Sequence, residues 1–362
     1  MRIRPFAILT VAVVAVAGCS ADPEPASTAV STSASASATP TPTPTPTITI
    51  KNADEKLTAA VAKVYEGKSG VKGEASLGTW GKEKVAVVTS GDDVTLAVGP
   101  SWKVVGGWWP SLKKKTDLGK TPRFMLVIGS DSPGSSLKGS RGDTLQIVGI
   151  DGKGGAGIVG IPRDLYVPLS TGGTAKINSA FAYGGGKAQL DTVKRVSGLP
   201  IEGYAVTGFA GFRKIVDESG GLPLVIDRSF RFLGLLDVKK GKQTADGNTV
   251  LAYARERKSL PDGDFGRSKH QQEIILAAAV AARLAGPEAL PRQMTITSKY
   301  AQTDMSAEQA LTFLAAFHKV NPAKVGHAVV PGTLGTSSDG QSIVKVTSAT
   351  KAGFAELEDG RL

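Results

Sequence analysis

The stretch that decides the fold is residues 124–161, which read FMLVIGSDSPGSSLKGSRGDTLQIVGIDGKGGAGIVGI. It contains three short apolar runs, at 124–128, 144–150 and 157–161. Continuous apolar runs bounded by Gly, Ser and Asp are typical of strands that are covered on both faces. The stretch therefore predicts three neighbouring strands of a buried sheet.

Helices are expected to alternate with strands after this stretch. The last of them begins with a capping-box pair, Ser306 and Gln309. Strands and helices interleaved in this way predict an α/β fold, a layered α/β/α domain with a central mixed sheet, over residues 121–362. The predicted helices cover residues 187–196, 209–218, 271–284 and 306–319.

Residues 51–120 predict a small strand-rich accessory region. A helical pattern from Leu57 to Tyr65 precedes two strand-like runs, 85–88 and 94–98, whose Ser-Gly-Asp-Asp separator indicates a hairpin. Three tryptophans follow, and two interpretations stay open for them: packing in a core or between domains, or contact with a membrane surface. They are Trp102, Trp108 and Trp109.

The N-terminus indicates export. Residues 1–18 pair a basic start with an apolar run that ends in small residues before Cys19, the only cysteine. This pattern predicts a signal peptide and lipidation of Cys19; the alternative is a plain secretory peptide with an incidental cysteine. Residues 19–50, rich in Ala, Ser, Thr and Pro, predict a disordered stalk. We expect the chain on the outer face of the cytoplasmic membrane, lipid-anchored and extracytoplasmic.

The chain is strongly basic, with a net charge of +11. A basic surface suits polyanions such as nucleic acid, anionic lipid headgroups or a phosphate-rich wall polymer. Because export removes nucleic acid as the usual partner, phosphate-rich partners outside the cell are expected.

Two carboxylates flank the loop between the first two predicted strands. Asp131 follows the first strand, and Asp143 comes just before the second. Ligands of α/β sheets bind beyond strand ends, and one or two carboxylates with substrate phosphates suit Mg²⁺. The sequence therefore predicts a magnesium site at Asp131 and Asp143. The alternative is that these aspartates cap turns.

Cations recur near other predicted elements. Arg163 follows the third strand, where its planar guanidinium suits phosphate oxygens. Any single one of the later cations is more often an ordinary surface charge, so the prediction depends on the set as a whole. The set continues with Lys176, Arg255, Arg257 and Arg267, ahead of Gln271.

The order and spacing of these motifs resemble the LytR-CpsA-Psr family over about residues 122–357. The motifs are Gly129-Ser130-Asp131, Arg141-x-Asp143-Thr144, Pro162-Arg163-Asp164, Lys176-Ile177-Asn178, Gly184-Gly185, Val216-Asp217 with Gly220-Gly221, Arg255-x-Arg257 and Asp264-x-x-Arg267. The resemblance implies a Mg²⁺-dependent phosphotransferase that moves a glycopolymer from a polyprenyl-pyrophosphate carrier onto peptidoglycan.

The resemblance also implies roles for individual residues. Asp131 and Asp143 match metal-associated aspartates, and helices around 209–216 and 274–280 would line a pocket for the lipid tail. The positions expected around the pyrophosphate are Arg141, Arg163, Lys176, Arg255, Arg257, Arg267 and Gln271.

This chain departs from the family pattern at two positions. It has Pro133 and His270 where the family usually has arginines, which predicts weaker or more pH-dependent phosphate binding. Two alternatives within the resemblance stay open: a polyprenyl-pyrophosphate hydrolase, and a non-catalytic lipid-binding or regulatory lipoprotein. A solute-binding lipoprotein is the alternative outside it.

Overall fold

The protein, described here as a computed structural model, is defined for residues 48–261 and 264–362. Its first part is a six-stranded sheet in the order β1-β2-β3-β4-β5-β6, with β1 parallel to β2 and the other pairs antiparallel. Helix α1 (Glu55–Val64) packs on it, capped by the Asp54 carboxylate. The strands are β1 Ile48–Lys51, β2 Val71–Trp80, β3 Glu83–Ser90, β4 Asp93–Val98, β5 Lys103–Trp109 and β6 Lys114–Asp117.

This accessory sheet confirms the predicted hairpin, which is β3–β4. It begins at Ile48, so residues 48–50, assigned to the stalk from composition, belong to the sheet. Alternating residues of β1 turn toward the core beneath α1, where Ile50 is buried. The predicted signal peptide, Cys19 and the remainder of the predicted stalk lie outside the described residues.

The three tryptophans pack against protein. Trp102 and Trp109 are buried in the accessory core, and their indole N–H groups donate to Asp54 and Thr95, at 2.9 and 2.8 Å. Trp108 stacks on His318 of the main domain, with ring centroids 6.3 Å apart. Of the two interpretations left open by the sequence, packing in a core and between domains is the one that the structure supports.

The central sheet of the main domain has the order β17-β12-β7-β8-β9-β18. The β12–β7 and β9–β18 pairs are parallel, whereas β8 runs antiparallel to both of its neighbours. The expected central mixed sheet is therefore confirmed. Its strands are β7 Arg123–Ser130, β8 Gly142–Ile150, β9 Ala156–Gly160, β12 Gly203–Thr207, β17 Gln302–Thr303 and β18 Val325–Val329.

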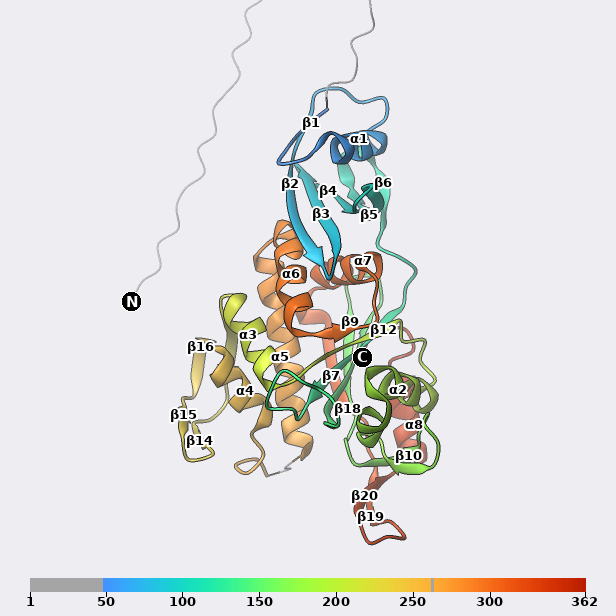
Figure 1. The fold of residues 1–362 in the computed structure, drawn as a ribbon, viewed down its shortest axis with the longest axis vertical. Coiled ribbons are helices and arrows are strands. Elements are labelled where there is room, and N and C mark those ends of the chain that lie inside the picture. Colours follow the sequence, from blue (N-terminus) through green and yellow to red (C-terminus); the bar gives the residue numbers. More distant parts are fainter. Residues whose placement is uncertain (1–47, 262–263) are drawn as a thin grey trace, which may run out of the picture. The chain divides into compact units, whose positions relative to one another are not determined.

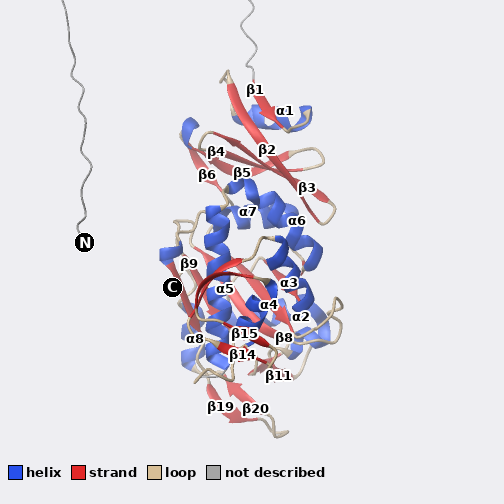
Figure 2. Cartoon of the chain, turned by 90° about the vertical axis from the view of Figure 1, so that its left-hand side faces the viewer, coloured by secondary structure: helices blue, strands red, loops and turns tan. Residues whose placement is uncertain are grey.

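Helices cover both faces of this sheet (Figures 1 and 2). Alternation along β7 turns Leu126 and Ile128 into a core with α2 and α8, and turns Met125 and Val127 toward a second core with α7. The result is the expected α/β/α layering. The helices are α2 Ser179–Ser197, α3 Phe209–Glu218, α4 Gly247–Arg255, α5 Asp264–Leu284, α6 Leu290–Tyr300, α7 Ala307–His318 and α8 Ser348–Ala355.

Two predicted helices differ from the observed ones in extent. α2 begins at Ser179 rather than 187, and the Gly184-Gly185 motif forms a kink inside the helix. α5 begins at Asp264 rather than 271, because its first turns are polar and carry no apolar periodicity. The predicted helix 209–218 and the Ser306–Gln309 capping box are confirmed.

A third core lies between α3, α4, α5 and two small hairpin-like pairs, β13–β16 and β14–β15. Another sheet has the order β11-β10-β20-β19. These strands are β10 Leu165–Pro168, β11 Thr174–Lys176, β13 Leu222–Ile226, β14 Phe230–Phe232, β15 Leu236–Val238, β16 Gly241–Ala245, β19 Thr333–Thr336 and β20 Ser342–Lys345.

Among the described residues, no single helix is both long and apolar enough to cross a bilayer. The segments Phe265–Leu284 and Pro287–Tyr300 meet that length and composition only as a pair, which is bent by 110° at the break between them.

Candidate active site

The strand directions bring the predicted site residues to one edge of the central sheet. β7, β9 and β12 end at this edge and β8 begins there, because Gly129 pairs with both Thr207 and Thr144 while Gln146 pairs with Gly160. Asp131, Asp143 and Arg163 all follow or begin strands at this edge. The structure thus places these three predicted residues, which follow or begin different strands, at the same edge of the sheet.

A register shift in the β7–β8 pair sets the direction of the Asp143 side chain. Gly129 pairs with Thr144 and Ser130 with Gly142, so Asp143 is left without a partner strand residue, as in a β-bulge. A side chain built on Gly142 would lie 3.5 Å from Leu145, on the α2 side of the sheet. The bulge therefore lets two consecutive residues, Asp143 and Thr144, face the same cavity.

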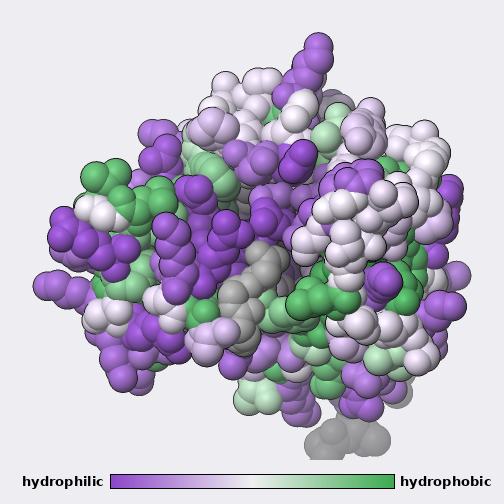
Figure 3. All heavy atoms as spheres, turned by 90° about the horizontal axis from the view of Figure 1, so that it is seen from below, coloured by the Kyte–Doolittle hydropathy of each residue, from purple (hydrophilic) through white to green (hydrophobic). Residues whose placement is uncertain are grey.

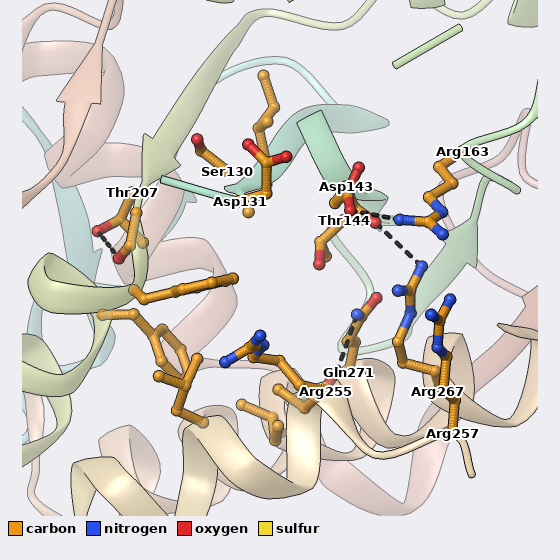
Figure 4. A pocket seen from close by; sticks show the side chains of 18 of the residues that line it. Ser130, Asp131, Asp143, Thr144, Arg163, Thr207, Arg255, Arg257, Arg267 and Gln271 are labelled. Carbon is orange, nitrogen blue, oxygen red and sulfur yellow. Dashed lines mark hydrogen bonds and ion pairs between the residues drawn. The ribbon is translucent and has the colours of Figure 1, made fainter. Parts of the chain in front are cut away.

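Asp143 is the centre of a polar network (Figure 4). Its carboxylate forms an ion pair with Arg163 and accepts a 3.2 Å hydrogen bond from the Asn178 amide. Arg267 donates to its backbone carbonyl at 3.4 Å. The Asp143 carboxylate is thereby fixed by two side chains, and its backbone carbonyl is held by a third.

The cavity at this edge has a volume of about 390 Å³ and two chemically different ends. Its polar end carries two carboxylates and five cations from the described residues: Asp131, Asp143, Arg163, Arg255, Arg257, Lys258 and Arg267. Its apolar end is formed by α3, α4, α5, β14 and the turn after β14: Phe209, Phe212, Phe232, Leu233, Leu251, Ile274 and Ile275. In Figure 4, Asp131 and Asp143 lie across the cavity from Arg255.

Arg255 lies where the two ends meet. Its guanidinium packs 4.1 Å from the ring centroid of Phe209 and 5.3 Å from that of Phe232. Burial lowers the pKa of the Arg255 guanidinium, and the charge of Asp143 partly opposes this. A half-buried cation among aromatic rings attracts an anion more strongly than a fully solvated cation does, because water screens the attraction less.

Gln271 is held by its neighbours. Its amide N–H donates to the Ala254 carbonyl at 3.1 Å, and its side-chain oxygen accepts from Gln146 at 3.2 Å. Gln146 is fully buried and also donates to Ser268 at 3.0 Å. Gln271 therefore presents one fixed face to the cavity that it lines.

The structure places other predicted residues outside the cavity wall. Lys176 pairs with Asp164 at 3.0 Å. Arg141 is exposed and acts through its backbone, whose N–H donates to the Asp131 carboxylate at 2.8 Å. Neither side chain belongs to the cavity lining, so neither lies where a direct contact with a ligand in this cavity was expected.

His270 faces away from the cavity. Its ring is buried and stacks on Tyr253 with centroids 3.9 Å apart, and its Nε2 lies 3.9 Å from the Asp227 carboxylate. Adjacent helical residues point about 100° apart, so Gln271 can line the cavity while His270 cannot. The expectation that His270 makes phosphate binding pH-dependent is therefore not supported by its position.

A second, smaller cavity of about 100 Å³ lies behind the Asp143–Arg163 pair. It shares Asp143, Arg163, Arg267 and Gln271 with the larger cavity, and its other wall comes from residues such as Phe265 and Leu334. The ion pair is thus accessible from two sides.

Asp131 and Asp143 are the carboxylates of the cavity that could hold Mg²⁺. Among the described residues, no group of three or more His, Cys, Asp or Glu side chains could hold a metal ion. Asp131 and Asp143 are hard oxygen donors that line one cavity, and Mg²⁺ commonly uses one or two carboxylates together with substrate phosphates. The residues therefore fit an ion that arrives with a phosphate ligand rather than a protein-only cage.

Sequence reasoning missed several residues of the site. Asn178 was noted only within a motif, and Gln146 was hidden in an apolar run, although a polar residue in such a run is itself a signal of a buried contact. Thr207, Phe232 and Leu233 line the cavity but carry no signal in the sequence. The predicted helices 209–216 and 274–280 do contribute lining residues.

Comparison with known proteins identifies the family. The LytR_cpsA_psr family model matches residues 109–356. The chain belongs to the LytR_cpsA_psr family.

Among curated relatives of this family member is the polyisoprenyl-teichoic acid–peptidoglycan teichoic acid transferase TagV of Bacillus subtilis (strain 168). It is 33% identical over 206 residues, which is 54% of this chain and 49% of TagV. The chain spans about half the length of the curated relatives it matches.

Solved structures show the same fold. The crystal structure of Bacillus subtilis TagV aligns with a TM-score of 0.57 at 24% identity, covering 67% of this chain and 98% of that one. The structure of TagT bound to LIIa-WTA aligns with a TM-score of 0.56 at 23% identity, covering 68% and 94%. At these identities the likeness supports the fold alone.

Proposed function

We propose that this LytR_cpsA_psr family member transfers a glycopolymer from a polyprenyl-pyrophosphate carrier onto peptidoglycan outside the cytoplasm. The observation that carries the proposal is the two-ended cavity, in which five cations adjoin an apolar pocket. A lipid pyrophosphate has the same two-part chemistry, a dianionic head on an apolar tail. The activity named for TagV, a teichoic acid transferase, supports the same class of reaction.

The reaction exchanges the phosphoanhydride bond of the carrier for a phosphodiester bond to peptidoglycan. The oxygen of a peptidoglycan hydroxyl attacks the phosphorus that carries the glycan, and the bond from this phosphorus to the bridging oxygen breaks. Polyprenyl monophosphate leaves, and the hydroxyl proton passes to a carboxylate. Guanidinium groups at the polar end offset the charge that develops on the bridging and terminal oxygens.

Asp131 is the better candidate for the proton acceptor. Both oxygens of Asp143 are engaged, one by Arg163 and the other by Asn178. Asp131 accepts through one oxygen from the Arg141 backbone, as far as the described residues show. Its second oxygen is therefore available to a hydroxyl placed in the cavity.

We further propose that the carboxylates of Asp131 and Asp143 would hold Mg²⁺ when a phosphate substrate is bound. When bound, the ion supplies positive charge to the pyrophosphate oxygens. Arg163, Arg255, Arg257 and Arg267, with Gln271, would orient the pyrophosphate. Lipidation of Cys19 would retain the protein at the outer face of the cytoplasmic membrane, where carrier and peptidoglycan meet.

The proposal is tested with the full chain, a polyprenyl-pyrophosphate glycan labelled in its glycan, and peptidoglycan fragments with Mg²⁺. Appearance of label in the peptidoglycan together with polyprenyl monophosphate is the expected result. Release of labelled glycan phosphate without transfer would instead support hydrolysis at the same site. Binding of the lipid without either product would support a non-catalytic carrier-binding protein.

A further inference from the structure

The β14–β15 pair ends in an exposed apolar tip next to the cavity. The tip consists of Leu233, Gly234 and Leu235, and its two leucine side chains are 63% and 87% exposed. The turn is well formed: Leu233 has a φ of 51°, Gly234 a φ of 72°, and the Leu235 N–H donates to the Phe232 carbonyl at 3.0 Å. These leucines are held outward by a defined turn.

The tip is anchored from below and continuous with the cavity. Phe232 and Leu236 pack against the third core, while Val238 is buried in it. Phe232 and Leu233 also line the apolar end of the cavity. One short element thus presents apolar side chains both to the cavity and to the outside.

Lysines lie at the base of the β14–β15 pair, the end opposite its tip, because Phe230 pairs with Val238 there and Lys239 and Lys240 follow directly. Residues 225–243 contain five cations and two acids, and Figure 3 shows apolar surface bordered by hydrophilic residues on this side of the molecule. Val225, 63% exposed, pairs across the strands with Lys242. The cations are Arg228, Arg231, Lys239, Lys240 and Lys242; the acids are Asp227 and Asp237.

We propose that the β14–β15 tip docks on an anionic lipid bilayer, inserting Leu235 and Leu233 among the headgroups while the lysines at the base of the pair contact lipid phosphates. Apolar side chains flanked by basic ones are the composition that binds anionic membrane interfaces. Docking would bring the apolar end of the cavity to the bilayer. If the proposed function holds, a carrier lipid could then enter the cavity beside Leu233 without crossing water.

The test places a probe on the tip. In the full chain, Leu235→Cys is labelled with an environment-sensitive fluorophore and reconstituted into vesicles of phosphatidylglycerol and phosphatidylcholine, some containing tail-brominated lipid. We expect a blue shift and quenching by the brominated lipid. Tyr183→Cys, a site 68% exposed on α2 across the sheet, is the control and is expected to show neither. The unsubstituted chain measures any label on Cys19.

Charge is tested separately. Replacing Lys239, Lys240 and Lys242 together by Gln is expected to weaken tip insertion by up to roughly a hundredfold, since each lysine near an anionic surface strengthens binding about fivefold. The same triple change at exposed Lys113, Lys114 and Lys115, on β6 and the residue before it, removes equal charge and is expected to leave insertion unchanged.

Three results would overturn docking. They are a solvent-like signal at position 235 in anionic vesicles, a blue shift without vesicles that grows with protein concentration and so indicates a second copy, and equal effects of the two lysine triples. Turnover of detergent-dispersed carrier is measured in parallel. Docking without turnover would count against the proposed function alone, and turnover without docking against this inference alone.

Discussion

Arg163 and Asp143 form an ion pair that lies in the wall common to both cavities of the site. Both side chains are 23% exposed, so the pair is reachable by ligands without being fully solvated. A phosphate entering the larger cavity would meet an arginine already oriented by its carboxylate partner. This makes Arg163 the most direct place to test binding.

Arg163→Ala is expected to weaken binding of a pyrophosphate lipid by about 1.5–3 kcal/mol, because a charge-assisted hydrogen bond is lost. Arg163→Lys should recover part of this, since lysine keeps the charge without the planar fork. Lys176→Ala is the matched control, because Lys176 pairs with Asp164 outside the larger cavity. Equilibrium binding of the lipid and thermal unfolding are measured for all three variants. An unchanged affinity of Arg163→Ala with a large fall in its Tm would show that Arg163 has a structural role.

Asp131→Asn and Asp143→Asn are each expected to abolish turnover and its Mg²⁺ dependence while changing stability little. Asparagine can still accept from the Arg141 backbone at position 131, but it lacks the anionic oxygen that a hard cation needs. Turnover is measured against Mg²⁺ concentration, with thermal unfolding on the same samples.

The control for the aspartate variants is Asp151→Asn. Asp151 caps a turn after β8 by accepting from the Lys153 and Gly155 backbone, at 2.6 and 2.8 Å. It should keep full activity. The contrary outcome is that Asp131→Asn and Asp143→Asn behave like Asp151→Asn, with Mg²⁺-responsive turnover near that of the unsubstituted chain. That result would refute the magnesium site and support the alternative that these aspartates cap turns.

His318 is expected to make stability depend on pH. Burial lowers its pKa, the nearby Arg283 and Lys319 contribute in the same direction, and the Ala282 carbonyl and Glu288 oppose them. Because the folded pKa is below the unfolded value of about 6.5, stability is complete above that pH and falls as the pH drops below it. Acid should therefore weaken the contact of α7 with Trp108 of the accessory sheet.

The measurement is Tm from neutral pH to about pH 5, where the unfolded state binds the proton first. His318→Gln can still donate to the Ala282 carbonyl and should show a smaller fall in Tm over this range. The Tm of His327→Gln, a change at an exposed position in β18, should fall over this range as much as the Tm of the unsubstituted chain. Identical pH profiles for all three chains would contradict the assignment to His318.

Cys19→Ser is expected to release the protein from membranes or leave it unprocessed, because the proposed lipid attaches to this thiol. Detergent-free fractionation followed by mass measurement of the N-terminal peptide reads both outcomes. Ser20→Ala, one residue further on, should remain in the membrane fraction. Equal retention of the two variants would refute lipidation as the anchor.

The sequence predicted the parts of the fold that depend on apolar pattern. β7, β8 and β9 were found because they are covered on both faces and hence almost uniformly apolar. β2 and β5 were missed, since glycines and charged residues interrupt their alternation. The start of α5 was missed because its first turns are polar and carry no apolar periodicity.

The sequence predicted that Asp131, Asp143 and Arg163 lie at strand ends of the sheet, and the structure places them at one edge; it did not predict the contacts around them. Residue type and order could indicate that Asp131, Asp143 and Arg163 meet. They could not indicate that the ring of His270 packs on Tyr253, or that Arg255 lies between two phenylalanine rings. Those facts depend on helix rotation and on contacts between segments far apart in the chain.

Because of the bulge at Asp143, the site depends on whether the number of residues at the start of β8 is odd or even. A strand alternates its side chains between two faces, and the extra residue shifts this count by one just before Thr144. Deleting a single residue between Ser140 and Thr144 would restore the even count, leaving β8 able to pair with β7 along its length. The remaining side chain before Thr144 would then turn toward α2. The number of residues at the start of β8, as much as their identity, determines whether a carboxylate faces the cavity.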